Sequence, residues 1–336
     1  MKIAVDAFGG DNAPQAVVEG VVQSLQKEKG FEIILFGDEG KIEAELKKYE
    51  YDKSRIQIVH APDVVGYDEA PTVAVKRKKE SSLVKALEAL RDKNADAFVS
   101  GGSTGAVLAG ATLIVRRLKG VKRPALAPLL PTRHGSYVLL IDCGANVDSK
   151  PSYLQQFAVM ADAYMREVGE VKKPRIGLIN NGAEEEKGNE LTKAAYQLLK
   201  KTPVHFTGNC EARDILCGEY DAVVCDGFIG NVVLKYTEGL AFTLMGMIKD
   251  ELMADTFSKL GAALSKNAFM RVKKKMDYTE YGGAPLLGID GCVIKAHGSS
   301  NGKAFTAAIL QAKRFYETGV NAAIARAVEA LPSIED

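Results

Sequence analysis

Short apolar segments alternate with helical patterns along almost the whole chain. Several of these segments are apolar throughout, which is typical of parallel strands buried on both faces. The predicted strands are Ile3–Asp6, Glu32–Phe36, Ile56–His60, Ala97–Ser100, Tyr137–Asp142, Arg175–Asn180, Val204–Thr207, Ala222–Asp226 and Cys292–Ala296. The predicted helices are Ala13–Lys27, Glu39–Lys48, Ser82–Asp92, Thr104–Leu118, Pro151–Val168, Glu190–Lys200 and Asn301–Thr318. This alternation predicts βαβ units and a mostly parallel sheet.

The alternation gives way near Ile229 to one long helical stretch that runs to about Met276. A Gly- and Ser-containing apolar segment, Ser258–Lys266, interrupts it, so we expect two helices joined there by a short turn. We interpret residues 229–276 as a projecting hairpin inserted in a single α/β domain that spans residues 1–336. The hairpin is either a core or dimerisation element or one whose tip touches an anionic membrane, and the two interpretations are compatible. The predicted tip residues are Leu260, Ala263 and Leu264.

Composition places the chain among ordinary globular proteins. Its 336 residues are 46% hydrophobic and 26% charged, which excludes intrinsic disorder, collagen and a disulfide scaffold. With 44 Lys and Arg against 43 Asp and Glu the net charge is +1, so a nucleic-acid partner has no electrostatic support. Five cysteines without a C-x-x-C pair fit a reducing compartment. With no signal-peptide pattern at the N-terminus and no apolar run of about 18 residues, we expect a cytoplasmic protein.

Glycine-rich turns follow many of the predicted strands. Seven such turns contain, in chain order, Gly9, Gly101, Gly144, Gly182, Gly208, Gly227 and Gly298. Ligands of open α/β sheets bind at the carboxyl ends of the strands, and glycine there lets backbone N–H groups approach an anion. The pattern therefore predicts a polar, anion-tolerant cleft, although each single turn could simply connect a strand to a helix.

Other signatures narrow the chemistry. Neither G-x-x-x-x-G-K-[ST] nor G-x-G-x-x-G occurs, which argues against a P-loop and against an ordinary dinucleotide site. The four histidines are scattered, so we predict no metal site. Ser103 lies in a G-x-S-x-G segment and could pair with Asp226 and His297, which leaves a serine thioester hydrolase open.

A series of motifs in order along nearly the whole chain resembles the PlsX family, the phosphate acyltransferases of bacterial phospholipid synthesis. The segments that carry the resemblance are residues 1–14, 76–79, 123–128, 142–148, 187–193, 208–214, 226–232, 281–284 and 294–300. Two positions depart from the family pattern. Ser103 stands where the family usually has Asn, and Cys143 where it usually has Val.

The resemblance implies a fold, a reaction and partners. The expected fold is a three-layer, Rossmann-like αβα sandwich similar to isopropylmalate dehydrogenase and phosphate acetyltransferase, in a homodimer. The expected reaction transfers a long-chain acyl group from acyl carrier protein to inorganic phosphate, without a cofactor. Family members act at the inner face of the membrane and pass acyl phosphate to a membrane acylglycerol-phosphate acyltransferase of the PlsY type, so we expect peripheral association with an anionic membrane surface.

Phosphate is itself the nucleophile of this reaction, so the enzyme has to hold a dianion and stabilise an oxyanion. The predicted catalytic residues are Lys187, Asn231, His297 and Asn209. The predicted phosphate- and substrate-binding residues are Gly9, Gly10, Asp11, Gly102, Ser103, Thr104, Asn146, Asn180, Asn189, Asp226, Gly227, Gly230 and Ser299. Asp6 and Asp142 are expected instead to hold their turns by hydrogen bonds.

Acyl carrier protein is strongly acidic as a family, so its docking surface should be basic. The predicted docking residues are Lys76, Arg77, Lys78, Lys79, Arg271 and Lys274. A second candidate patch comprises Arg116, Arg117, Lys119, Lys122 and Arg123. Three further interpretations stay open: a short-chain phosphate acyltransferase that uses coenzyme A, a dehydrogenase on the same architecture, and a non-catalytic membrane scaffold.

Overall fold

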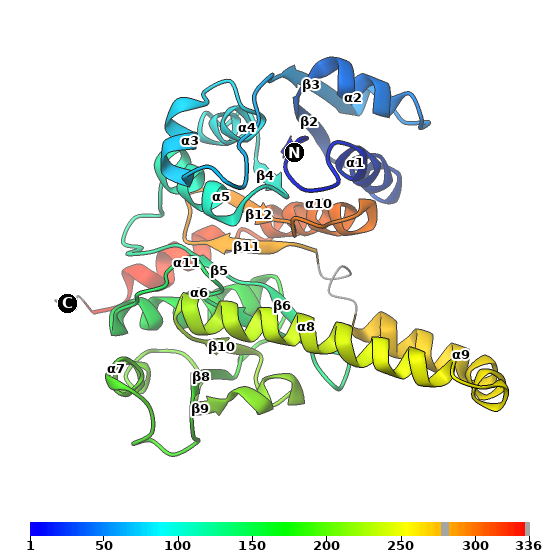
Figure 1. Cartoon of the computed structure of the whole chain (residues 1–336). Helices are drawn as coiled ribbons and strands as arrows, with labels where there is room; N and C mark the ends of the chain where they lie inside the picture. The colour runs from blue at the N-terminus through cyan, green and yellow to red at the C-terminus, as the bar shows by residue number, and fades with distance from the viewer. Residues whose placement is uncertain (277–281, 333–336) are drawn as a thin grey trace.

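The strands of the protein form two sheets, with helices packed around both (Figure 1). The computed structural model describes residues 1–276 and 282–332, apart from the side chains of Lys273, Lys274 and Met276. The first sheet has seven strands in the order β3 (Ile56–His60), β2 (Glu32–Gly37), β1 (Lys2–Asp6), β4 (Ala97–Ser100), β12 (Cys292–Lys295), β11 (Ala284–Leu287) and β5 (Ala125–Leu126). The second has five, in the order β6 (Leu129–Pro131), β7 (Tyr137–Ile141), β10 (Ala222–Val224), β8 (Ile176–Asn180) and β9 (Phe206–Glu211).

Most neighbouring strands are parallel, as their continuous apolar patterns predict. The first five strands of the first sheet pair in parallel, whereas β11 pairs antiparallel with both β12 and β5. In the second sheet only the edge pair β6–β7 is antiparallel. Since parallel strands point the same way, the turns after β1, β4 and β12 lie along one edge of the first sheet. Those after β7, β10 and β8 likewise share one edge of the second.

Helices cover the sheets and bury their apolar faces. The described helices of the sandwich are α1 (Gln15–Lys27), α2 (Glu39–Leu46), α3 (Pro71–Arg77), α4 (Ser82–Arg91), α5 (Thr104–Gly110), α6 (Pro151–Glu167), α7 (Glu190–Leu199), α10 (Gly302–Glu317) and α11 (Val320–Glu329). Figure 1 shows α1 and α10 side by side, and a Cβ at Gly20 of α1 would overlap Phe305 of α10. Leu87 of α4 and Val107 of α5 belong to a separate apolar core. The predicted α/β sandwich is confirmed.

The sequence-based element bounds need four corrections. The short strands β5, β6 and β11 and the helices α3 and α11 were not predicted. The predicted strand Val204–Thr207 lies two residues early, since β9 spans Phe206–Glu211. The predicted helix Thr104–Leu118 ends as α5 at Gly110 and continues only as a π-helical turn over Ala111–Val115. The strands also divide between two sheets.

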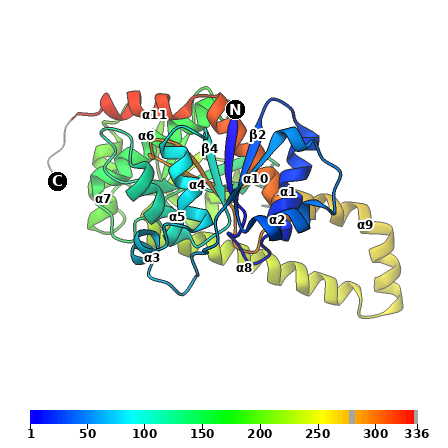
Figure 2. The same ribbon diagram turned by 90° about the horizontal axis from the view of Figure 1, so that it is seen from above.

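The two longest helices, α8 (Gly227–Leu252) and α9 (Thr256–Met276), form a hairpin that extends away from both sheets (Figures 1 and 2). The turn that joins them covers residues 253–255, so the predicted interruption at Ser258–Lys266 is wrong. The Asp255 carboxylate accepts hydrogen bonds from the N–H groups of Phe257 and Ser258 and thereby starts α9, whereas Gly261 is tolerated within it. Leu260, Ala263 and Leu264 consequently lie in the first turns of α9, beyond the connecting turn.

The hairpin leaves many apolar side chains uncovered. Phe242, Phe257 and Leu264 are 84%, 88% and 82% exposed. Within residues 1–276 and 282–332, no helix is both long and apolar enough to cross a membrane. An apolar surface of this extent on a helical pair indicates an interaction surface.

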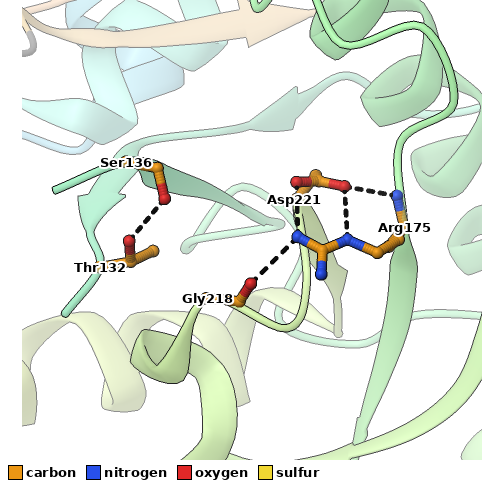
Figure 3. A network of polar contacts seen from close by, with 5 residues as sticks. All are labelled: Thr132, Ser136, Arg175, Gly218 and Asp221. Atoms are coloured by element: carbon orange, nitrogen blue, oxygen red, sulfur yellow. Dashed lines mark hydrogen bonds and ion pairs between the residues drawn. The ribbon is translucent and has the colours of Figure 1, made fainter. Parts of the chain in front are cut away.

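A polar network ties strand β8 to β10 at the end of the second sheet away from the glycine-rich turns (Figure 3). Arg175 donates from Nε and Nη2 to the Asp221 carboxylate, each over 3.0 Å, and from Nη2 to the Gly218 carbonyl. Nearby, the hydroxyls of Thr132 and Ser136 are hydrogen-bonded to each other over 2.7 Å. Burial would raise the pKa of Asp221, but the hydrogen bonds from Arg175 outweigh it and hold that pKa below its ordinary value.

Candidate active site

A cavity of about 300 Å³ lies between the two sheets, at the edges where their glycine-rich turns lie and where the hairpin begins. We call these the site edges of the sheets. The described residues that line it are Thr104, Leu126, Pro128, Leu129, Leu130, Cys143, Gly144, Asn231, Leu234, Lys235, Glu238, Gly282, Gly283, Ala284, Lys295, Ala296 and His297. Three of these are predicted site residues: Thr104, Asn231 and His297. The first sheet supplies Lys295 and His297, and α8 supplies Asn231 and Lys235, so the site requires both parts of the fold.

A cluster of three basic side chains occupies the polar side of this cavity. Lys235 Nζ lies 3.2 Å from His297 Nε2 and 2.8 Å from Glu238 Oε2. His297 Nδ1 lies 2.8 Å from the Ser299 hydroxyl, so Ser299 orients the imidazole ring. Lys295, only 7% exposed, donates to the carbonyls of Gly101 and Ala296. Two ammonium groups beside an imidazole make a site that favours an anion.

The charge states of this cluster follow from burial and mutual repulsion. Burial, reinforced by the charge of Lys235, lowers the pKa of Lys295 to about 8. Burial and the same Lys235 charge lower the pKa of His297 below its ordinary value, so the imidazole is neutral at pH 7. A neutral ring can accept a hydrogen bond from Lys235, whereas an imidazolium would repel it. Burial also raises the pKa of the Cys143 thiol well above its ordinary value, which keeps this lining residue protonated and unsuited as a nucleophile.

The turn after β7 holds Asn231 in place. Asp142 is fully buried and accepts hydrogen bonds from the backbone of Leu126, Ala145 and Asn146, as predicted for a turn-holding residue. Gly144 adopts φ +98°, and a Cβ there would touch the Asn231 side chain at 3.6 Å. The amide of Asn231 therefore lies directly over this turn.

The other predicted residues of this edge serve the architecture. Asn146 Nδ2 donates to the Pro124 carbonyl and to Asp142. Asp226 starts α8 by accepting from the Ile229 N–H over 2.9 Å. Gly227 donates its N–H to the Asn146 carbonyl, and a Cβ at Gly230 would overlap the Asp142 carbonyl oxygen, so these glycines allow α8 to pack on the turn.

The glycine-rich turns of the first sheet come together as predicted. The Asp11 N–H donates to the Gly298 carbonyl over 2.8 Å, and a Cβ at Gly10 would lie 3.1 Å from that same oxygen. A Cβ at Gly9 would overlap the Asp6 carboxylate and lie 2.7 Å from the Gly102 nitrogen. Asp6 accepts from the hydroxyls of Ser82 and Ser100. These residues form a compact backbone platform beside Lys295.

Ser103 occupies the N-cap position of α5, and its side chain makes no capping hydrogen bond. Asp226, which the hydrolase alternative would need near it, lies at the start of α8 and caps that helix. His297 meets Ser299 and Lys235 at its two nitrogens. The geometry therefore favours the lysine–histidine cluster over a serine triad.

A third group of predicted residues lies after β8, along the site edge of the second sheet. Asn180 Nδ2 donates to the Lys187 carbonyl and to Asn209 Oδ1, and Asn209 Nδ2 donates to the Glu184 carbonyl. Asn189 starts α7 by accepting from the Thr192 N–H. The amides of Asn180 and Asn209 thus shape the loop that carries Lys187. The exposed Lys187 side chain is absent from the described lining of the cavity.

The predicted docking residues lie in two places. Lys76 and Arg77 are exposed at the end of α3 beside exposed Lys79, whereas Lys78 is bonded to Glu69 over 2.6 Å. Arg271 is exposed on α9. The Lys274 side chain lies outside the described residues, as does Tyr281 of the family motif.

The sequence interpretation missed Lys235, Lys295 and Glu238. Lys295 had a visible signal, because a lysine within the otherwise apolar segment 292–296 has to be buried with a partner. Lys235 had none, since its role depends on how α8 crosses the end of β12. Tyr67 was missed as well. Its hydroxyl donates to the Gly101 carbonyl, and burial together with the Asp11 charge raises its pKa to about 12.

Comparisons with known proteins identify the family of the chain. The model of a family described as fatty acid synthesis protein matches residues 1–323. A phosphate acyltransferase of Clostridium perfringens is 53% identical over 94% of both chains. Another, of Clostridium acetobutylicum, is 52% identical over 98% of this chain and 100% of its own.

Solved structures extend the likeness of fold. EutD phosphotransacetylase of Staphylococcus aureus matches with a TM-score of 0.59 at 17% identity, over 98% of this chain and 94% of that one. A branched-chain phosphotransacylase of Enterococcus faecalis matches with a TM-score of 0.57 at 14% identity, over 94% and 99% of the two chains. At these identities the likeness concerns the fold alone.

Proposed function

Because the chain belongs to the fatty acid synthesis protein family, which includes relatives named phosphate acyltransferase, we propose that it transfers a long-chain acyl group from acyl carrier protein to inorganic phosphate. The products are acyl phosphate and the free carrier-protein thiol. The observation that carries the proposal is the two-sided cavity between the sheets, which joins an apolar wall to a cluster of cations.

The apolar wall supports a fatty acyl substrate. Its side chains come from the segment around β5 and β6 and from α8, namely Leu126, Pro128, Leu129, Leu130 and Leu234. A volume of about 300 Å³ holds the acyl chain next to the thioester, and the start of the exposed hairpin continues from it. Burial of each further CH₂ stabilises binding by about 0.8 kcal/mol, which favours long chains over short ones.

The polar side supports phosphate. Lys295 and Lys235, which is also ion-paired with Glu238, can offset part of the charge of a phosphate dianion bound beside them. The amide of Asn231 can donate to the oxyanion that develops on the thioester carbonyl. Neutral His297 is oriented by Ser299 and can accept a proton from a protonated phosphate oxygen as that oxygen attacks.

The reaction balances without a covalent enzyme intermediate. A phosphate oxygen forms a bond to the thioester carbon, and the carbonyl oxygen carries the resulting charge. The carbonyl then re-forms as the C–S bond breaks, and the electron pair of that bond leaves with the sulfur. The sulfur takes up the proton that His297 received from phosphate, which gives the free thiol and returns His297 to its neutral form. Lys187, at the same edge of the second sheet as Asn231, remains a predicted further cation for phosphate or for the oxyanion.

The test is an acyl-transfer assay with palmitoyl carrier protein and phosphate, following thiol release and trapping acyl phosphate with hydroxylamine. We expect phosphate-dependent release by the wild-type protein. In Lys235→Gln, loss of one charge should raise the KM for phosphate by roughly tenfold with little change in the KM for the thioester. Lys249→Gln, on the last turn of the same helix α8, is the matched control and should behave like the wild type.

Two results would contradict the proposal. Thiol release that does not need phosphate indicates thioester hydrolysis, and Ser103→Ala would then have to abolish it. Turnover of butyryl-coenzyme A without turnover of palmitoyl carrier protein indicates the short-chain alternative. Lys187→Ala tests the remaining catalytic prediction in the same assay, with a fall in kcat expected.

The hairpin supports two finer parts of the proposal, a homodimer and contact with an anionic membrane. Its exposed apolar residues include Phe257, Leu260 and Leu264, and Lys259 and Lys266 lie among them. Apolar residues beside lysines suit an anionic lipid surface, where acyl phosphate would meet a membrane acyltransferase. Leu264→Gln should reduce co-sedimentation with phosphatidylglycerol vesicles. Unchanged co-sedimentation would contradict the tip assignment.

A further inference from the structure

A second cavity, of about 530 Å³, opens on the other side of the turn that follows β7. It lies between α5, the segment 117–124 and the start of α6. The described residues that line it are Leu108, Thr112, Arg117, Lys122, Arg123, Pro124, Ala145, Asn146 and Tyr153. Three of these are cations, and no Asp or Glu occurs among the described lining residues.

The cations of this cavity are held in position by the protein itself. Arg117 Nη1 donates to the Lys122 carbonyl. The Lys122 N–H donates to Gln156 Oε1 over 2.8 Å, and Lys122 Nζ donates to the Ser152 hydroxyl over 3.2 Å. The guanidinium of Arg123 lies over the Tyr153 ring, 5.8 Å from its centroid. Cations that are positioned in advance lose less conformational freedom when an anion binds.

Only one turn separates this cavity from the site between the sheets. Cys143 and Gly144 line the cavity between the sheets, whereas the next two residues, Ala145 and Asn146, line the second cavity. The two cavities also follow one another along α5, where Thr104 lines the first and Leu108, about one turn further on, lines the second. A substrate that places its thioester among Asn231, Lys235 and Lys295 can therefore extend past this turn into the basic cavity.

We propose that this basic cavity binds the phosphodiester that joins the pantetheine arm to the carrier protein, which rests on the function proposed above. The arm carries the thioester at one end and a phosphodiester at the other, so it needs an anion site separate from that of the attacking phosphate. Arginine provides bidentate donors to phosphate oxygens, and the apolar residues Leu108, Pro124 and Ala145 suit the uncharged part of the arm. The acidic carrier protein then lies over Arg117 and Arg123.

The experiment compares three acyl donors in the variant Arg123→Gln: palmitoyl carrier protein, palmitoyl-N-acetylcysteamine, which lacks the phosphodiester, and palmitoyl-coenzyme A. We expect the KM for palmitoyl carrier protein to rise roughly tenfold, with the kcat/KM for palmitoyl-N-acetylcysteamine and the KM for inorganic phosphate both within about twofold of wild type. Arg117→Gln should give the same pattern. Arg91→Gln, on the exposed end of α4, is the matched control and should change none of these values.

Other patterns overturn the inference. An equal loss with palmitoyl-N-acetylcysteamine would mean that Arg123 acts on the shared site, and a raised KM for inorganic phosphate would make the cavity the phosphate site. A loss confined to palmitoyl-coenzyme A would assign it to nucleotide phosphates. Normal kinetics of both arginine variants, with an active wild-type enzyme, would contradict this inference alone. A wild-type protein that releases no thiol in response to phosphate would contradict the proposed function instead.

Discussion

Two buried aspartates, Asp6 at the end of β1 and Asp142 at the end of β7, hold the turns that border the site in the two sheets, but through different partners. Asp6 accepts from the hydroxyls of Ser82 and Ser100 over 2.6 and 2.7 Å and from the backbone N–H of Phe8. Asp142 accepts from three backbone N–H groups and from the Asn146 amide. Burial raises the pKa of both carboxyls. The difference lies in how freely the partners can reorient.

A hydroxyl can donate or accept, whereas a backbone N–H can only donate. The turn on Asp6 should therefore tolerate a change of its central residue better than the turn on Asp142. The Asp142 turn also supports α8, which carries Asn231 and Lys235 into the cavity. We therefore expect the Asp142 turn, which positions the whole of α8, to be the more rigid of the two turns.

The largest expected effect comes from separating α8 from the Asp142 turn. A Cβ at Gly230 would overlap the carbonyl oxygen of Asp142, so Gly230→Ala has to displace the helix. We expect a loss of about 3 kcal/mol in the free energy of unfolding, together with a loss of acyl transfer, since Asn231 and Lys235 move with the helix. Urea denaturation and the acyl-transfer assay measure the two effects.

Gly239 provides a control on the same helix. A Cβ at Gly239 would meet nothing within 4 Å, so Gly239→Ala should leave the free energy of unfolding unchanged or raise it by up to about 1 kcal/mol through helix propensity. If both alanine variants lost stability equally, close packing of α8 on the Asp142 turn would not be the cause.

A smaller effect separates the two aspartates themselves. In Asp142→Asn, the new NH₂ group has to face a backbone N–H, which leaves buried donors unpaired and should cost about 2–3 kcal/mol. In Asp6→Asn, Ser82 or Ser100 can rotate and accept from the amide, so the cost should be about 1 kcal/mol or less. Denaturation in urea of both variants gives the comparison. An equal or reversed order would show that partner type does not set the rigidity of these turns.

Much of this arrangement can be predicted from local sequence. Continuous apolar segments indicated most strands, and the glycine-rich turns after many of them indicated the edge of the sheet where the site lies. The turn-holding roles of Asp6 and Asp142 are confirmed by their hydrogen bonds. These features depend on residues close in sequence, or on a backbone requirement such as the φ of +98° at Gly144.

The remaining features depend on contacts between distant segments. Lys235 becomes a site residue only because α8, which follows the second sheet's strand β10, crosses the end of β12 in the first sheet. There the Lys235 side chain contacts His297. The same holds for the hairpin turn. Both Gly261 and Asp255 are plausible ends of a helix by residue type, and only the capping hydrogen bonds of Asp255 decide between them. Local patterns locate turns and strands, but not which side chains from separate sheets meet.

The smallest expected effect is a dependence of stability and of phosphate binding on pH. It comes from Lys295, which lies on the same side of the site as Asp6 and donates to the Gly101 carbonyl. Burial lowers the pKa of Lys295 from an ordinary 10.5 to about 8. Between these values the folded protein binds fewer protons than the unfolded chain, so this residue makes the free energy of unfolding rise with pH. Loss of the same proton removes a charge from the phosphate site, so the KM for phosphate should rise severalfold above pH 8. In Lys295→Gln both trends should disappear. If the KM for phosphate rises equally above pH 8 in the variant, another group is responsible for the titration. If the free energy of unfolding rises with pH while phosphate affinity falls, and only the wild type shows this, the titrating group is Lys295.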